Sequence, residues 1–165
     1  MRQLELFLKE STVATVEQQT ETRYTPAYVA FGTFKNFVDT LKTNGIPGEV
    51  NKSVMTNLSG GTQSHLTSAL KALLLVEADG TPTSALRELV DSYNSPAWNS
   101  TLKAVLDAAY GDIVGNLDLS KASPKELEDR FGDHVEGASL VDKAVRFYIT
   151  AMKEAKVELS PYLGK

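Results

Sequence analysis

The 165-residue chain has no cysteine and only two histidines, which narrows the chemistry open to it. Without cysteine there are no disulfides, no thiolate metal sites and no cysteine nucleophiles. His65 and His134 lie far apart in the sequence, without the i, i+4 spacing of a helical metal site. The carboxylates around Glu126 and Asp133 lie on a short polar segment, where solvation is the simpler interpretation than an acid–base pair. The sequence therefore predicts no enzyme, no bound metal and no cofactor.

The chain also lacks an excess of positive charge and any long apolar run. Its 17 Lys and Arg are outnumbered by 21 Asp and Glu, for a net charge of −4, whereas nucleic-acid-binding proteins are usually basic. The apolar run at the N-terminus is broken by Glu5 and Lys9, and is too short for a signal peptide or a membrane span. We expect a cytoplasmic protein, or one inside an assembled particle, with no membrane partner.

Residues 26–94 show the element order of a winged helix-turn-helix. The pattern predicts a helix over residues 33–43, a short helix over 51–58, a glycine turn, and a longer helix capped by Thr62. The longer helix would bury an apolar stripe formed by Leu66, Ala69, Leu70, Leu73 and Leu74. A tight hairpin after it would form the wing, made of Asp79, Gly80 and Thr81.

Residues 95–165 repeat this order of elements. A helix capped by Thr83 closes the first module, and Ser95-Pro96 predicts the start of the next helix. Ser123 and Glu126 have the spacing of a capping box, and a long helix is expected over residues 139–155. We expect a mainly α fold of two tandem winged-helix-like modules, with the second either a degenerate repeat of the first or similar by chance.

Residues 1–25 form a separate N-terminal arm in this interpretation. The segment begins with a short apolar stretch and continues as a run rich in Thr, Gln and Glu, which suits an extended conformation. Two alternatives remain open for it, a frayed tail and an arm that docks on a neighbouring subunit.

Three short motifs give the first module a family resemblance. They are a Pro-Ala-Tyr opening at residues 26–28, Gly-Ile-Pro at 45–47 after the first helix, and a Leu-Leu-Val…Asp-Gly-Thr-Pro-Thr ending over 74–83. With these motifs the chain resembles the bacterial family catalogued as domain of unknown function 5343, closely over residues 25–93 and loosely beyond them. The resemblance implies a bacterial or phage origin and a helical fold, and it implies no activity.

The polar face of the third helix is the candidate contact surface. Opposite the leucine stripe this face carries Gln63, Ser64, His65, Thr67, Ser68 and Lys71. A neutral face of this kind favours a non-enzymatic interaction or assembly module that binds a protein partner or self-associates. The alternative is a winged-helix transcriptional regulator, because Gln and Ser can contact base edges in duplex DNA. That alternative is electrostatically weak unless Lys35, Lys42, Lys52 and Lys71 gather into one positive patch.

Overall fold

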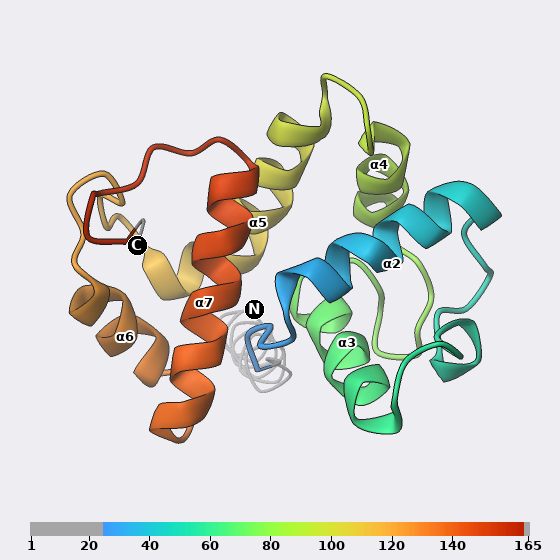
Figure 1. Cartoon of the computed structure of the whole chain (residues 1–165), viewed down its shortest axis with the longest axis horizontal. Coiled ribbons are helices and arrows are strands. Elements are labelled where there is room, and N and C mark those ends of the chain that lie inside the picture. The colour runs from blue at the N-terminus through green and yellow to red at the C-terminus, as the bar shows by residue number, and fades with distance from the viewer. Residues whose placement is uncertain (1–24, 164–165) are drawn as a thin grey trace, which may run out of the picture.

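The computed structural model describes residues 25–163 and shows a mainly α fold, as expected (Figure 1). The helices are α2 (Phe31–Asn44), the single-turn 3-10 helix η1 (Lys52–Val54), α3 (Gly60–Ala72), α4 (Ser84–Ser92), α5 (Trp98–Val114), α6 (Pro124–Gly132) and α7 (Ala138–Glu154). No β-strand occurs over the described range. The predicted N-terminal arm lies outside the described residues except for Thr25.

The helices pack as two groups that meet where α4 contacts α5 and where α2 contacts α7. Helices α5, α6 and α7 pack on one another, α4 packs on both α2 and α5, and α2 also contacts α7. Figure 1 shows α7 lying between α6 and the N-terminal end of α2. The first and second halves of the chain are therefore in direct contact through long helices rather than joined only by a linker.

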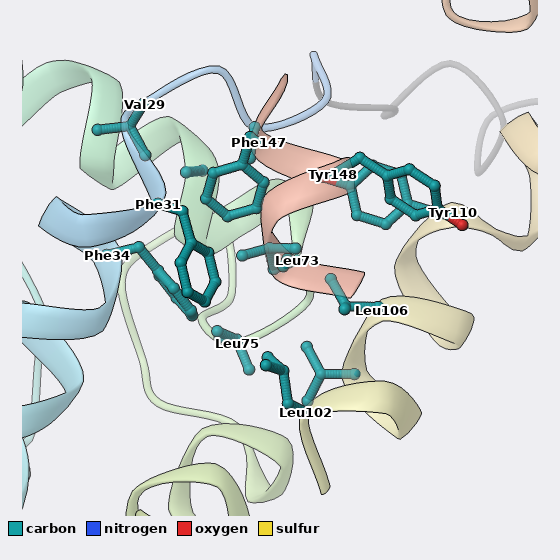
Figure 2. Close-up of a cluster of buried hydrophobic side chains, with 14 of the residues drawn as sticks. Val29, Phe31, Phe34, Leu73, Leu75, Leu102, Leu106, Tyr110, Phe147 and Tyr148 are labelled. Atoms are coloured by element: carbon teal, nitrogen blue, oxygen red, sulfur yellow. The ribbon is translucent and has the colours of Figure 1, made fainter. Parts of the chain in front are cut away.

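Three phenylalanines form this contact. Phe31 and Phe34 on α2 meet Phe147 on α7, with ring centroids 5.6 and 5.8 Å apart, and all three rings are buried. The two pairs are edge-to-face, which is a favourable aromatic geometry. Figure 2 shows the three rings side by side, with Leu73 and Leu75 next to them. The two halves share one continuous core.

Two predicted helix starts are confirmed by their hydrogen bonds. The Thr83 hydroxyl accepts from the backbone N–H of Leu86 at the start of α4. Ser123 and Glu126 form a complete capping box at the start of α6. The start predicted at Ser95-Pro96 is wrong by about two residues, because α5 begins at Trp98 and its cap position is Ala97, without a side-chain cap. The Ser95 hydroxyl accepts from the N–H of Ala97 just before the helix.

The helix-turn-helix region differs from the prediction in two ways. Only residues 52–54 of the expected helix over 51–58 are helical, because Asn51 caps a single turn by accepting from the N–H of Ser53. Helix α3 starts at Gly60 and is capped by Ser59, not by Thr62, whose N–H donates to the Ser59 hydroxyl. The short polar residues before the turn favour local capping over a longer helix.

The β-hairpin wing is not supported, and with it the winged-helix architecture. One isolated antiparallel bridge joins Val76 and Pro82, and no strand extends it. The tip of the expected wing packs on Val50. Gly80 at this tip is buried, and its carbonyl accepts from the N–H of Val50 at 2.9 Å. The Asp79 carboxylate accepts from the N–H of Thr81, which closes the turn locally. The N–H of Glu77 donates to the Thr81 carbonyl and the N–H of Thr83 to the Leu75 carbonyl on either side of this bridge. The chain enters α4 directly after Thr83, so no ladder extends beyond it.

Helices α3 and α7 end in the same backbone motif. In each, the residue after the helix cap takes a left-handed conformation, Leu74 with φ 61° and Lys156 with φ 63°. The next N–H then bonds back into the last turn, Leu75 to the Leu70 carbonyl and Val157 to the Met152 carbonyl, both at 3.0 Å. The prediction that Leu74 is buried is wrong, because this turn leaves its side chain 50% exposed.

Glu154 joins three helices by hydrogen bonds to its carboxylate. The indole N–H of Trp98 donates at 2.9 Å and the Lys35 ammonium lies 2.8 Å away. Partial burial by itself raises the pKa of Glu154. The hydrogen bonds from Lys35 and Trp98, with the positive charge of Lys35, outweigh burial and leave the pKa below its ordinary value. The ionised carboxylate is thus part of how α2, α5 and α7 are held together.

We expect Glu154→Gln to lower the free energy of unfolding at neutral pH by about 1 kcal/mol, a modest value because Lys35 is partly exposed. A lowered pKa means that the wild-type advantage is present above about pH 4.5 and is lost as the pH falls through the folded-state pKa. Urea unfolding of both proteins between about pH 7 and pH 3 measures this difference. The exposed Glu158→Gln variant serves as the control, and a gap that stays constant on acidification would contradict the assignment.

Candidate functional site

Two residues of the predicted contact face, Gln63 and Thr67, make hydrogen bonds within the folded chain. The Gln63 side-chain amide donates to the carbonyls of Met55 and Leu58, at 2.8 and 3.0 Å. The Thr67 hydroxyl donates to the Gln63 carbonyl at 2.7 Å. Both side chains are half-buried. Gln63 holds the preceding turn against α3, whereas the Thr67 bond lies within α3. Replacement of Gln63 would disturb the turn as well as any contact made there.

The remaining four residues of that face do not form one free surface. Ser64 and His65 are exposed, whereas Ser68 and Lys71 are half-buried. The His65 ring packs on Tyr28, with ring centroids 4.8 Å apart. The predicted wing residues are also engaged, since Gly80 is packed on Val50 as described above.

His65 lies at the rim of a cavity of about 390 Å³ between the starts of α2 and α3 and the side of α7. The cavity has aromatic walls from Phe31 and Phe147, and Lys143 and Arg146 lie at its edge. The start of α2 has no side-chain cap and no acidic residue in its first turn, which favours a negative group there. Arg146 is paired with Asp142 at 2.9 Å, so part of this positive charge is already neutralised.

A second concave surface, which we call the α4–α5 groove, has a mainly apolar lining that also includes Glu88, Ser100 and Thr101. Its volume is about 390 Å³. The lining residues come from the end of α3 and from α4 and α5, and include Leu73, Leu74, Ala85, Ala104, Val105 and Ala108. Ala104 and Ala108 are exposed and lie one helical turn apart on α5. Neither alanine belongs to a site predicted from the sequence. The i, i+4 spacing of these two small residues on the polar side of α5 is the sequence feature that could have indicated a surface there.

Leu74 is unfavourable at the edge of this groove for two reasons. Its left-handed backbone costs a leucine roughly 1–2 kcal/mol. Its side chain is one of two large apolar ones that are exposed over residues 25–163, the other being Tyr162. The equivalent position after α7 is occupied by Lys156, which is exposed and charged. Neither conformation nor solvation explains a leucine here, whereas contact with a partner would.

The lysines proposed for a phosphate-binding patch are largely engaged elsewhere. Lys35 pairs with Glu154, and the Lys42 ammonium donates to the Asp91 carbonyl at 2.9 Å. Three further ion pairs join residues one turn apart on exposed helix faces: Lys103–Asp107, Lys125–Asp129 and Arg146–Asp142. Positive and negative charges are therefore interleaved on these faces, which does not favour a phosphate backbone.

No group of three or more His, Asp or Glu side chains is arranged to hold a metal ion over residues 25–163. No helix there combines the length and apolar character that crossing a membrane requires.

Comparison with known proteins gives a family but no activity. No curated protein and no solved structure shows a significant match to the chain. A family model described as a family of unknown function, DUF5343, matches residues 27–158, which span both halves of the molecule and both concave surfaces. The resemblance noted from the motifs of the first half thus extends over most of the chain, and the protein belongs to the DUF5343 family.

Proposed function

We propose that this protein is a non-enzymatic interaction module that self-associates through the α4–α5 groove. The observation that carries the proposal is Leu74, a half-exposed leucine in a left-handed conformation beside an apolar groove. Burial of this side chain by a second copy would offset both its exposure and its backbone cost. A cytoplasmic location, or one inside an assembled particle of bacterial or phage origin, is part of the same proposal.

The chemistry of α5 supports a second copy of the chain as the occupant. Ala104 and Ala108 have small side chains, which let another helix approach closely. Lys103 and Asp107 lie on one flank of α5, 2.6 Å apart. In an antiparallel two-fold pairing centred near Val105, Lys103 of each copy would face Asp107 of the other. A symmetric pair therefore has complementary charges at its edge and apolar surface at its centre.

We expect Leu74→Asn to weaken self-association by about a hundredfold, because a symmetric dimer loses roughly 1.4 kcal/mol of apolar burial at each of its two copies of Leu74. Asparagine suits the left-handed conformation, so the variant keeps the turn after α3. We expect Ala108→Arg to abolish association, since a long charged side chain would fill the groove. Sedimentation equilibrium over about 1–300 µM measures the dissociation constant of each protein.

Tyr162→Ser is the matched control, because it removes the other large exposed apolar side chain without touching the groove. Its dissociation constant should equal that of the wild type. A wild-type protein that stays monomeric over the whole concentration range would reject the proposal. So would a dimer that both groove variants leave unchanged, since its interface would then lie elsewhere.

The alternative of a DNA-binding winged-helix regulator has less support. The wing is folded onto Val50, Gln63 is bonded to the preceding turn, and two of the four candidate phosphate-contacting lysines have partners. A gel-shift assay with random duplex at low salt tests it directly, because electrostatic binding is strongest there.

A further inference from the structure

The cavity between the starts of α2 and α3 and the side of α7 carries positive charge without matching negative charge. Lys143 and Arg146 both line it, whereas no acidic side chain among the described residues does. In the whole chain acidic residues outnumber basic ones by 21 to 17, so this lining departs from the average composition. The α4–α5 groove, by contrast, includes Glu88. The cavity therefore favours an anion as its ligand.

Both cationic side chains are within reach of a molecule that enters from solvent. Lys143 and Arg146 are exposed and lie on one face of α7 at i, i+3 spacing. Lys143 has no ion-pair partner among residues 25–163. Arg146 contacts Asp142 through one guanidinium nitrogen, at 2.9 Å, and the guanidinium group has further N–H donors. Both side chains can thus donate to a ligand without the loss of a buried contact.

The backbone at the start of α2 is also open to a ligand and adds to the effect of the two cations. The N–H of Gly32 lies in the first turn, where the helix itself offers it no acceptor. Ala30 and Gly32 are small and exposed, and a Cβ added to Gly32 would meet nothing within 4 Å. A negatively charged group can therefore approach this turn closely, where the helix dipole stabilises it.

The amount of positive charge suits a ligand with a single negative charge. Lys143 contributes one full charge, and Asp142 offsets part of the charge of Arg146. A carboxylate carries one negative charge at neutral pH, whereas a phosphate monoester carries nearly two. A carboxylate thus matches the charge of the cavity more closely than a phosphate does.

The reachable apolar surface of the cavity is aromatic. Tyr28 is half-buried and His65 is exposed, and their rings are in contact, with centroids 4.8 Å apart. Phe31 and Phe147 also line the cavity, but both are buried, and Figure 2 shows them side by side. The volume, about 390 Å³, is near the lower end of ligand pockets, which run from roughly 300 to 1,000 Å³. These walls suit a compact aromatic body.

We propose that this cavity binds a small aromatic monocarboxylate. The carboxylate lies beside Lys143, Arg146 and the first turn of α2, and the ring lies against Tyr28 and His65. The cavity shares no lining residue with the α4–α5 groove, so ligand binding and self-association are tested by different variants.

Two probes of nearly equal shape test the role of charge. Benzoate carries a carboxylate where benzamide carries a neutral amide. Amide NMR titration of the full chain with each probe gives the two dissociation constants, and resonances of residues that line the cavity should shift. At about 20 mM salt we expect benzoate to bind about tenfold more tightly, as for two partly exposed charge interactions. At about 500 mM salt most of this preference should be lost through screening.

Lys143→Gln should weaken benzoate binding by about threefold to fivefold and leave benzamide binding unchanged. Adding Arg146→Gln should lower the preference for benzoate to about twofold, the part that the first turn of α2 supplies. Both side chains are exposed, so the Tm of each variant should stay within about 2 °C of the wild type. Lys52→Gln is the matched control, because it removes the charge of an exposed lysine that does not line the cavity, and it should keep the tenfold preference.

Three results would overturn the proposal. The first is the absence of saturable shifts at the cavity with benzoate up to about 20 mM. The second is equal affinity of the wild type for benzoate and benzamide at low salt. The third is an equal loss of benzoate affinity in Lys52→Gln and Lys143→Gln, since the attraction would then come from the net charge of the whole molecule.

Discussion

Phe147→Ala is expected to lower the free energy of unfolding by about 3–5 kcal/mol and to weaken both halves of the molecule together. The Phe147 ring is 2% exposed and contacts Phe31 and Phe34 across the boundary between the halves. Its removal leaves a cavity between α2 and α7 that neither rigid helix can collapse to fill. Because the core is continuous, the loss should appear as one cooperative transition shifted to lower urea.

Two probes in one titration measure this prediction. Fluorescence of Trp98, the single tryptophan, follows the second half, and amide NMR of α3 follows the first. Tyr162→Ala is the aromatic control, with an expected effect below about 0.5 kcal/mol, because that ring is exposed. Unfolding of the two halves at clearly different urea concentrations in the wild type would contradict a shared core.

Gly80→Ala is expected to lower the free energy of unfolding by roughly 3–4 kcal/mol. Gly80 has φ +92°, and a Cβ built there would lie 2.7 Å from the carbonyl oxygen of Val50. The clash is with backbone at the point where the N–H of Val50 donates to the Gly80 carbonyl, so relief would break that hydrogen bond. Backbone strain, steric overlap and the lost hydrogen bond therefore add together.

Gly45→Ala separates these contributions. Gly45 has the same φ of +92°, but a Cβ there would meet nothing within 4 Å. We expect this variant to lose about 1–2 kcal/mol from backbone strain alone. Chemical denaturation of the two variants measures the difference, and equal losses would mean that the packing of the turn on Val50 contributes nothing.

The parts of the fold that sequence predicts well are those set by neighbouring residues. Thr83 and the Ser123–Glu126 pair cap helices because their side chains reach backbone N–H groups three residues away. The same local logic explains the error at α3, where Ser59 and Thr62 are both suitable caps and only the three-dimensional structure selects Ser59.

The parts that sequence missed depend on contacts between distant residues. On the last long helix, predicted over residues 139–155, the helical spacing of Val145, Tyr148 and Met152 gives one apolar stripe. Helix α7 instead buries a second face, because Phe147 packs on α2. The prediction of a wing is not supported for a similar reason, since the tip of the turn packs on Val50, some thirty residues earlier in the sequence. No periodic pattern within one helix carries that information.

In the candidate sites too, sequence predicts what neighbouring residues determine and misses what contacts between distant residues determine. The sequence pattern predicts a polar helical face, but the hydrogen bonds from Gln63 to the Met55 and Leu58 carbonyls could not be read from it. Tyr110 continues the spacing of Leu102 and Leu106 on α5 by one further turn, and all three are buried. The Tyr110 hydroxyl has no hydrogen-bond partner among the described residues, which is a property of the folded structure alone.

The phenylalanine contact between α2 and α7 also has a consequence for biosynthesis. Phe34 leaves the ribosome about 110 residues before Phe147, which is on the order of ten seconds at typical elongation rates. During that interval the apolar side of α2 lacks the ring that covers it in the finished molecule. The nascent chain is thus most exposed to chaperones and proteases just before its last helix emerges, and truncation before α7 should direct the product to degradation.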